Sequence, residues 1–288
     1  MNIISLQSAV TFGHVGNSAA VFPMQRLGHE VWPVYTVNFS NHTEYPSWCG
    51  PVIAPSDVAA VLDGISFAFA EVDVFLTGYL GSPELAQVVF DTVQRIKAAN
   101  PDALYVCDPV IGNATVGSFV GEEIPDVFRE QLIPLADAIT PNHWELALLT
   151  GTDLLTVGDT VSAARNLCDR ALVTSIGAYT DETLGMLDIT PDAALLVETP
   201  RLGGNVVGAG DLATALFAAM QDQPGVDRLS HLAGTMFDIV SVVRERDLAE
   251  LPLVEWQDLI VDPRSRFTPT PVCLLYTSPS PRDRQKSR

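Results

Sequence analysis

Basic residues are scarce in this sequence. It contains 16 Lys and Arg residues against 35 Asp and Glu residues, which gives a formal net charge of −19 and a sequence pI near 4.4. A chain with this excess of negative charge repels nucleic acids and anionic membrane surfaces, so we expect neither as a partner. If the chain binds a phosphorylated ligand, the local positive potential must come from helix N-termini or from a bound cation such as Mg²⁺.

The sequence also lacks the signals of secretion, membrane insertion and metal-stabilised folding. No apolar run reaches the length of a transmembrane helix, and Met1 leads directly into a short strand-like run rather than a signal peptide. The 4 cysteines are scattered without C-x-x-C spacing, and the 5 histidines show no metal-ligand spacing. We therefore expect a cytoplasmic protein with neither a disulfide framework nor a structural zinc site.

Two common phosphate-transfer signatures are absent as well. The sequence contains no G-x-x-x-x-G-K-[ST] motif, which excludes a P-loop enzyme. It contains no H-R-D or D-F-G set either, which excludes a protein kinase.

The last residues differ in composition from the rest of the chain. Residues 273–288 carry four Arg and Lys residues against one Asp, in a sequence that is otherwise acidic. They resemble the translation of a sequencing-library adapter, and we interpret them as a non-native tail. The alternative is a genuine basic, disordered tail. We expect residues 1–272 to form a single domain, since no long linker or repeat divides them.

Apolar runs of two different periods alternate along the chain. Strands are expected at residues 2–8, 30–37, 72–77, 103–107, 136–139, 171–175, 184–189 and 194–198, the last two as an antiparallel pair. Helices are expected at residues 18–27, 56–70, 83–99, 124–135, 143–149, 157–168, 228–244 and 253–260, with a further helix starting at Asp211. This alternation predicts an α/β fold with a mostly parallel sheet covered by helices on both faces. Pro33 predicts that the second strand lies near the sheet edge or at a bulge.

Residues able to bind a ligand follow several of these expected strands. The set is Ser8, Gly78 and Tyr79, Asp108, Asn142, Ser175 and the turn before Asp211. In a parallel sheet, ligands bind at the carboxyl ends of the strands, where these residues would meet. The sequence therefore predicts one binding site at that edge.

The most informative stretch is NVVGAGDLATALF at residues 205–217. Val206 and Val207 are predicted to end an extended segment, and Gly208 and Gly210 lead into an apolar helix opened by Asp211. A glycine-rich turn at a helix N-terminus binds anions, and a carboxylate there could take a proton from an attacking hydroxyl. One alternative is that Asp211 merely caps the helix. Another, a dinucleotide site, is disfavoured because no strand follows the helix.

Other residues could serve phosphoryl transfer, each with a structural alternative. Asp108 and Glu145 could hold Mg²⁺ directly or through water, although Asn142 and Glu145 also fit a capping box. Thr174 and Ser175 offer hydroxyls to a phosphate, or are simply polar loop residues. Tyr79 could stack on a flat ring, or belong to the core.

Six segments together resemble the pyridoxal kinase family of the ribokinase-like superfamily. They are LQSAVTFGHVGNSAAVFPMQRLG, VNFSNHTEY, LTGYLGS, YVCDPVIG, ITPNHWELALLTG and VGAGDLATAL, and the resemblance spans about residues 1–265. It implies a ribokinase-like fold and ATP-dependent phosphorylation of the 5′-hydroxymethyl group of pyridoxal, with pyridoxine and pyridoxamine as further candidates. Family members are commonly homodimers that use Mg²⁺, often with K⁺.

The resemblance also implies roles for individual residues. It implies vitamer contacts by Ser8, Thr43, Glu44 and Tyr79; phosphate and Mg²⁺ contacts by Asp108, Thr140 and Glu145; ATP contacts by Thr174, Ser175, residues 199–202 and Val207; an anion hole at Gly208 and Gly210; and Asp211 as the base. Three departures put contacts in doubt. The segment 199–207 is short for the family, Asn113 stands where some relatives have an acidic residue, and Thr174 replaces a Lys of some bacterial relatives.

Two other functions are weighed against this one. A hydroxymethylpyrimidine or sugar kinase of the same fold is the close rival, but pyrimidine kinases carry Cys where this chain has Asp211, and the FSNHTEY loop with Tyr79 suits a flat ring rather than a sugar. A non-catalytic vitamer-binding protein is disfavoured by the intact Asp108, Glu145 and Asp211.

Overall fold

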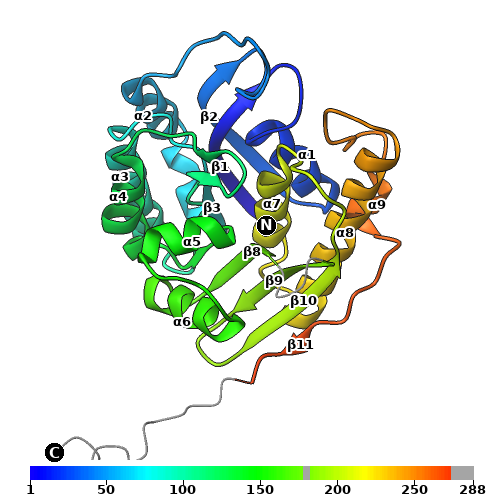
Figure 1. The fold of residues 1–288 in the computed structure, drawn as a ribbon. Coiled ribbons are helices and arrows are strands. Elements are labelled where there is room, and N and C mark those ends of the chain that lie inside the picture. The colour runs from blue at the N-terminus through cyan, green and yellow to red at the C-terminus, as the bar shows by residue number, and fades with distance from the viewer. Residues whose placement is uncertain (178–181, 274–288) are drawn as a thin grey trace, which may run out of the picture.

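The computed structural model describes residues 1–177 and 182–273, and these form three layers with the sheet in the middle (Figure 1). The main sheet has nine strands in the order β11-β10-β9-β8-β7-β4-β3-β1-β2. From β2 to β8 every neighbouring pair is parallel, and from β8 to β11 every pair is antiparallel. The predicted α/β class and the mostly parallel sheet are confirmed, as is the antiparallel pair β9 and β10.

The strands range from two to ten residues in length. Their bounds are β1 Asn2–Val10, β2 Glu30–Phe39, β3 Val74–Thr77, β4 Leu104–Cys107, β7 Ala138–Ile139, β8 Ala171–Gly177, β9 Thr183–Ile189, β10 Ala194–Pro200 and β11 Thr270–Pro271, with a separate hairpin of β5 Gly112–Asn113 and β6 Gly117–Ser118. Strand β2 ends the row at one side. An edge strand tolerates the missing N–H of Pro33, so that prediction is confirmed.

Helices cover both faces of the sheet, and each face has its own apolar core (Figure 1). On one face lie α2 Pro55–Gly64, α3 Leu85–Ala99, α4 Ile124–Val127, α5 His143–Thr150 and α6 Val157–Leu167; on the other lie α1 Asn17–Arg26, α7 Ala209–Ala219, α8 Gly225–Glu245 and α9 Asp258–Val261. Alternate strand residues feed the two cores, as Ile3 and Ile4 of β1 do. The site is therefore built on strand ends held rigidly from both sides.

Several predicted boundaries need correction. The helix expected at residues 56–70 ends at Gly64, and a separate 3-10 helix, Ser66–Glu71, follows it. The helix expected at 124–135 starts as α4 and continues as a π turn, Phe128–Leu132, and a 3-10 turn, Ile133–Leu135. The helix expected at 253–260 is reduced to α9. In each case buried apolar residues produced a longer helical pattern than the backbone follows.

The prediction that residues before the GAGD turn form an extended segment was wrong. Strand β10 ends at Pro200, and residues 201–207 lie in neither helix nor strand. Val206 and Val207 are β-branched, but they contact the turn rather than a strand ladder, because the Val206 carbonyl accepts from the N–H of Ala209 at 3.2 Å. The turn thus starts from a loop and not from a strand end.

The end of the described chain is attached to the sheet. β11 pairs with β10, and the N–H of Val272 donates to the carbonyl of Ala194 at 2.8 Å. The predicted non-native segment, residues 273–288, lies outside the described residues except for Cys273. In the described ranges no helix combines the length and apolarity that a bilayer crossing requires.

Candidate active site

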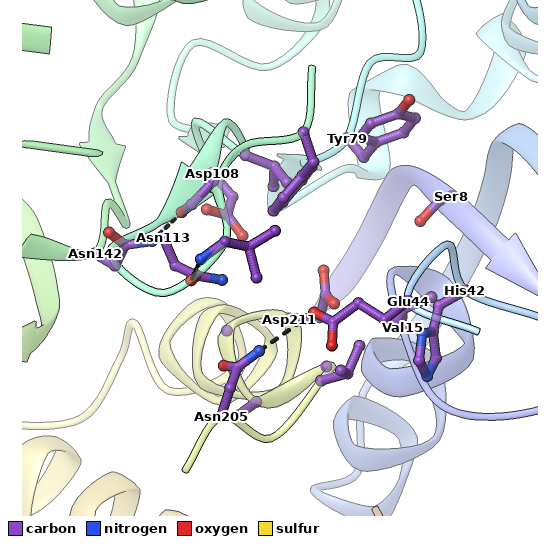
Figure 2. Close-up of a pocket in the computed structure, with 18 of the residues that line it drawn as sticks. Ser8, Val15, His42, Glu44, Tyr79, Asp108, Asn113, Asn142, Asn205 and Asp211 are labelled. Carbon is purple, nitrogen blue, oxygen red and sulfur yellow. Dashed lines mark hydrogen bonds between the residues drawn. The ribbon is translucent and has the colours of Figure 1, made fainter. Parts of the chain in front are cut away.

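A cavity of about 520 Å³ opens at the carboxyl ends of the parallel strands (Figure 2). Most residues predicted for the site line it: Ser8, Thr43, Glu44, Tyr79, Asp108, Thr140, Asn142, Glu145, Thr174, Ser175, Val207, Gly208, Gly210 and Asp211. Gly78 is absent from the described lining. Figure 2 shows Tyr79, Ser8 and His42 on one side, Asn113 and Asn142 on the other, and Asp211 between them. Asp211 therefore lies between two differently lined parts of the cavity.

The side that holds Tyr79 is apolar with a polar floor. Val10, Val37 and Phe39 form a small cluster against which Val15 and Tyr79 pack. Ser8 lies at the point where the pairing of β1 with β2 shifts register, between Gln7 and Ala9. Such a bulge re-aims a side chain, and here it faces Ser8 into the cavity. The strand itself runs two residues beyond the predicted end at Ser8, to Val10.

The glycine-rich turn begins α7. Its N-cap is Gly208, with φ 81°, and a Cβ at this position would lie 1.8 Å from the carbonyl oxygen of His14. Only glycine tolerates both the left-handed backbone and the close approach. Asp211 is the third residue of the helix, so the interpretation of Asp211 as the N-cap was wrong, and the helix opens two residues earlier than predicted.

Gly210 and Asp211 face the cavity from the first turn of α7. A Cβ at Gly210 would meet no atom within 4 Å, so packing within the protein does not require glycine there. Its absence of a side chain leaves the helix N-terminus open to a ligand, where N–H groups without helical partners favour anions. Burial raises the pKa of Asp211 to about 6, although backbone N–H groups, including that of Gly16, oppose the rise.

Asp108 follows β4 and is buried. Its Oδ2 accepts a hydrogen bond from the hydroxyl of Thr214 at 3.0 Å, and that hydroxyl lies 2.9 Å from the hydroxyl of Thr140. Burial, followed by the charges of Glu145 and Asp211, raises the pKa of Asp108 well above its ordinary value. The carboxyl is thus held by two threonines but not by a positive charge.

Glu145 belongs to a capping box at the start of α5, as the structural alternative predicted. The Asn142 side chain accepts from the N–H of Glu145 at 2.9 Å, and Glu145 Oε2 accepts from the N–H of Asn142 at 2.9 Å. Its Oε1 also accepts from the N–H groups of Ile111 and Gly112 at 2.9 and 3.1 Å. Burial nevertheless raises the pKa of Glu145 to about 7. Glu145 therefore fixes the loop after β4, and it also places a carboxylate in the cavity.

The three carboxylates have no basic counterpart in the cavity. Among the described lining residues there is neither Lys nor Arg. No group of three or more His, Cys, Asp or Glu side chains in the described ranges is arranged to hold a metal ion. Asp108 and Glu145 fit a Mg²⁺ ion carried largely by waters and phosphate oxygens, which is the usual arrangement for this ion.

Thr174 and Ser175 lie within β8, which runs to Gly177 rather than ending at Ser175 as predicted. Its pairing with β9 shifts register between Val173 and Ile176, and Ser175 has φ 56°. A left-handed backbone at a non-glycine residue costs of the order of 1 kcal/mol and is concentrated at functional sites. Residues 199–202, for which ATP contacts were doubtful, are absent from the described lining of the cavity.

Comparison with known proteins agrees with this geometry. Residues 51–225 match the family model described as phosphomethylpyrimidine kinase. The pyridoxal kinase PdxY of Leifsonia xyli is 46% identical over 277 residues, covering 93% of this chain and 98% of that protein. The PdxY of Corynebacterium diphtheriae is 43% identical over 277 residues, with the same coverage of 93% and 98%. The chain belongs to the pyridoxal kinase family.

Solved structures of this pyridoxal kinase family are also similar. The pyridoxal kinase of Leishmania donovani in complex with ADP and pyridoxine superposes with a TM-score of 0.88 at 27% identity, covering 94% of this chain and 99% of that one. A complex of the same enzyme with ADP alone gives a TM-score of 0.87, with coverage of 94% and 99%. This likeness confirms the ribokinase-like fold predicted from the resemblance.

Several residues of this kinase site were missed at the sequence level. His42 lines the cavity, and the Asn205 amide donates to Glu44 Oε1 at 3.3 Å across its rim (Figure 2). Glu250 contacts His42, although they are 208 positions apart. The loop holding His42 has no periodicity, and nothing in the local sequence around Glu250 indicates a distant partner. Only the tertiary fold brings them together.

Proposed function

We propose that this cavity catalyses the ATP-dependent phosphorylation of the 5′-hydroxymethyl group of pyridoxal, a step of vitamin B6 salvage, with pyridoxine and pyridoxamine as further substrates. The relatives named above support this reaction by name, and the Leishmania enzyme binds ADP and pyridoxine in the same fold. The observation that carries the proposal is the position of Asp211. It lies at the N-terminus of α7, between an apolar wall with Tyr79 and a polar side with Asp108.

Each ligand has a part of the cavity suited to its chemistry. The flat pyridine ring stacks on Tyr79, and its polar substituents contact Ser8, Thr43 and Glu44. ATP lies on the opposite side, where Thr140, Thr174, Ser175 and Val207 are in reach of it. The phosphoryl group passes between the two ligands beside Gly208 and Gly210, whose helix N-terminus stabilises the charge that develops on it.

Asp211 is the general base in this proposal. Its carboxylate takes the proton from the 5′-hydroxyl as the oxygen attacks the γ-phosphorus of ATP, and the bond from that phosphorus to the β,γ-bridging oxygen breaks. The products are ADP and the phosphate ester, and the proton on Asp211 then passes to solvent. A pKa of about 6 suits this task, because Asp211 is ionised at neutral pH yet basic enough to accept a proton.

Asp108 and Glu145 would hold Mg²⁺ with the ATP phosphates. When bound, Mg²⁺ supplies positive charge that the described lining residues lack. We extend the proposal to K⁺ as a monovalent activator and to a homodimeric assembly, both supported by the resemblance to the family. We also propose a cytoplasmic location, which the lack of secretion and membrane signals in the sequence favours. Assays in Na⁺ against K⁺ test the activator, light scattering tests the dimer, and cell fractionation tests the location.

A coupled assay of ADP release across several acceptors tests the reaction. Purified enzyme with Mg-ATP is offered pyridoxal, pyridoxine, pyridoxamine, hydroxymethylpyrimidine and ribose, and phosphate-ester formation is checked by mass spectrometry. We expect the highest kcat/KM for pyridoxal. Preference for hydroxymethylpyrimidine or ribose would show that the chain is a hydroxymethylpyrimidine or sugar kinase of the same fold. Binding of pyridoxal without turnover of any acceptor would indicate a vitamer-binding protein.

The single-domain assignment for residues 1–272 is also a proposal. Pairing of β11 with β10 supports it, because the sheet uses residues up to Val272. A chain that ends at Val272 should keep the melting temperature and kcat of the full chain. A clear loss of either would show that residues 273–288 contribute.

A further inference from the structure

One carboxylate outside the reacting cluster joins two loops at the vitamer end of the cavity. Glu250 Oε1 accepts from the hydroxyl of Tyr45 at 2.8 Å and lies 3.1 Å from His42 Nε2. Its Oε2 accepts from the N–H of His14 at 2.9 Å. The Glu250 side chain is only 15% exposed, and a Cβ on Gly13 would lie 2.4 Å from Oε2. Each oxygen therefore serves a different loop.

These two loops carry residues of the proposed vitamer pocket. The first, residues 40–46, bears Thr43 and Glu44, which line the cavity between the two Glu250 contacts. The second, residues 11–16, contacts the catalytic turn: the carbonyl of His14 lies against Gly208, and the N–H of Gly16 contacts the carboxylate of Asp211. Glu250 thus reaches both the ring pocket and the base through one intermediate loop each.

Backbone pairing alone does not hold the first loop. The ladder between the two loops ends with the bonds from Thr11 to the Phe39 carbonyl and from Phe12 to the Ser40 carbonyl. Beyond Ser40, the Asn41 amide donates to the carbonyls of His42 and Ser47, and its oxygen accepts from the Ser40 hydroxyl, all within residues 40–47. Among the described contacts, three side-chain hydrogen bonds join positions 42–45 to distant segments: two to Glu250 and one from Asn205 at the rim. The Tyr45 ring also lies edge-on to Phe12 of the second loop, with centroids 5.9 Å apart.

The segment that carries Glu250 is itself well fixed. It follows α8, where the N–H of Leu248 donates to the carbonyl of Val243 at 2.9 Å. Leu251 and Leu253 are fully buried, and Leu251 approaches Gly208 as well. The position of Glu250 is therefore well fixed, and two loops without regular structure bind to its carboxylate.

We propose that Glu250 is a positioning residue that holds the Thr43 and Glu44 loop in its vitamer-binding conformation. It does not touch the reacting atoms. The proposal rests on the function proposed above for the identity of the substrate. Without the clamp, only a fraction of molecules has the loop in place, and the apparent affinity for the vitamer falls by that fraction. The proposed ATP contacts lie on β8, after β4 and β7, and in the turn before α7. None of these residues bonds to Glu250 among the described contacts, so we expect ATP affinity to depend little on it.

The first test separates the two substrates. In Glu250→Ala we expect the KM for pyridoxal to rise about tenfold and the KM for ATP to stay within about twofold. Glu250→Gln, which keeps the size and one acceptor oxygen, should fall between. Glu255→Ala is the matched control, since it removes an exposed carboxylate on the same segment, paired only with Arg246 among the described contacts at 2.6 Å. It should leave both constants unchanged.

Tyr45→Phe supplies a milder test if Glu250→Ala folds poorly. It deletes one hydroxyl that does not line the cavity, and we expect a two- to threefold rise in pyridoxal KM. In the Glu250→Ala background the same change should add nothing, because the partner is already gone. Full additivity of the two changes would contradict the clamp.

Hydrogen exchange tests the clamp without any substrate. Amides of residues 41–45 should exchange faster in Glu250→Ala than in Glu255→Ala, with the exchange of α7 unchanged. Unaltered exchange there, or equal rises in the KM of both substrates, would overturn the proposal. If the wild-type chain phosphorylates no vitamer, the proposed function fails, and the exchange result still decides whether Glu250 holds the loop.

Discussion

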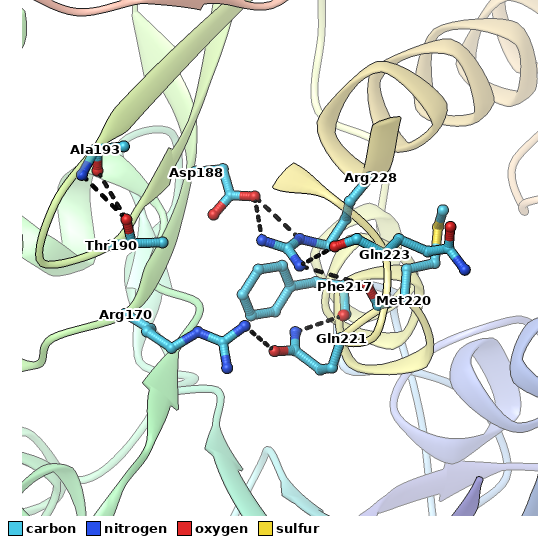
Figure 3. A network of polar contacts seen from close by, with 9 residues as sticks. All are labelled: Arg170, Asp188, Thr190, Ala193, Phe217, Met220, Gln221, Gln223 and Arg228. Atoms are coloured by element: carbon cyan, nitrogen blue, oxygen red, sulfur yellow. Dashed lines mark hydrogen bonds and ion pairs between the residues drawn. The ribbon is translucent and has the colours of Figure 1, made fainter. Parts of the chain in front are cut away.

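Two regions of this molecule bury carboxylates, and they treat the negative charge differently. Where α8 packs on β9, Asp188 Oδ2 of β9 accepts from Arg228 Nε of α8 at 3.0 Å and from its Nη2 at 2.6 Å (Figure 3). Arg228 Nη1 also donates to the carbonyls of Met220 and Gln223, and its guanidinium lies 5.2 Å over the ring of Phe217. Both side chains are almost fully buried, at 3% and 4% exposure. Here the chain supplies the countercharge itself.

The active-site cavity has the opposite arrangement. Asp108, Glu145 and Asp211 face one space whose described lining has no Lys or Arg, and burial raises the pKa of all three. A fold selected only for stability would pair or remove such groups. The difference indicates that the countercharge at the cavity arrives with the ligands, whereas at Asp188 it is permanent. Buried charge without a partner therefore marks the functional region of this chain.

The largest expected effect comes from removing the base. Asp211→Asn keeps the size of the side chain, so pyridoxal should still bind, but kcat should fall by about 10²–10⁴-fold. The melting temperature should not fall, because the change removes a carboxylate whose charged form is disfavoured by its surroundings, and the Asn side-chain oxygen can still accept from Gly16. Steady-state kinetics with pyridoxal titration on the folded variant measure both. A kcat near that of the wild type would remove Asp211 from the role of base.

The second effect should appear in stability alone. Arg228→Met leaves Asp188 buried without its partner, and we expect the free energy of unfolding to fall by about 3–5 kcal/mol. The kcat and KM of the folded fraction should not change, because Arg228 does not line the cavity. Urea denaturation measures the loss.

A matched double variant sharpens the Arg228 prediction. Arg228→Met with Asp188→Leu removes both charges and should recover much of the lost stability, since an apolar pair of similar volume often replaces a buried ion pair. Failure of the double variant to recover would mean that packing, and not charge, explains the loss.

Stability as a function of pH should report the active-site carboxylates. Burial raises the pKa of Asp188 as well, although Arg228 opposes the rise, so a variant of Asp211 is needed to separate the two regions. The folded pKa of Asp211 is about 6 against an ordinary 3.8, so its contribution to stability is fully present below about pH 4 and is lost as pH rises through 6. Glu145 follows the same sign through about pH 7. The ligand-free enzyme should thus lose about 1–1.5 kcal/mol through Asp211 between pH 5 and pH 8.

Asp211→Asn isolates that contribution from the effect of overall charge. The variant should be more stable than the wild type at pH 8, and the gap should shrink toward pH 5, where Asp211 itself is protonated. Thermal unfolding across this range without nucleotide measures the gap. A gap that is constant with pH would show that Asp211 titrates at an ordinary value.

Particular residues show which features of the fold and the site could be predicted from the sequence. Parallel strands and both helix layers were predictable because β-branched runs and helical periodicity are local signals, and ligand-binding residues at strand ends follow from the geometry of parallel sheets. The N-cap at Gly208 could not be predicted from the local sequence, because it depends on the close approach of His14, 194 positions away.

Contacts between distant segments account for the other misses. Glu250 has no local pattern, and its role depends on the segment after α8 lying beside the loops that follow β1 and β2. The bulge that aims Ser8 into the cavity depends on pairing between β1 and β2. Strand lengths at Val10 and Gly177 were underestimated because polar residues interrupt the apolar runs where those strands enter the site.

The smallest expected effect tests the uncharged wall of the cavity against its charged floor. Tyr79 lines the cavity beside Val37 and Phe39, and stacking of an aromatic pair contributes about 0.5–1.5 kcal/mol beyond buried area. Tyr79→Ala should raise the KM for pyridoxal about threefold to tenfold and leave the KM for ATP nearly unchanged, because only the pyridine ring stacks there. The pH dependence of stability assigned to Asp211 should persist, since no buried carboxylate has been altered. Initial rates with each substrate varied in turn separate the two constants. Equal rises in both would mean that Tyr79 supports the cavity as a whole rather than the ring.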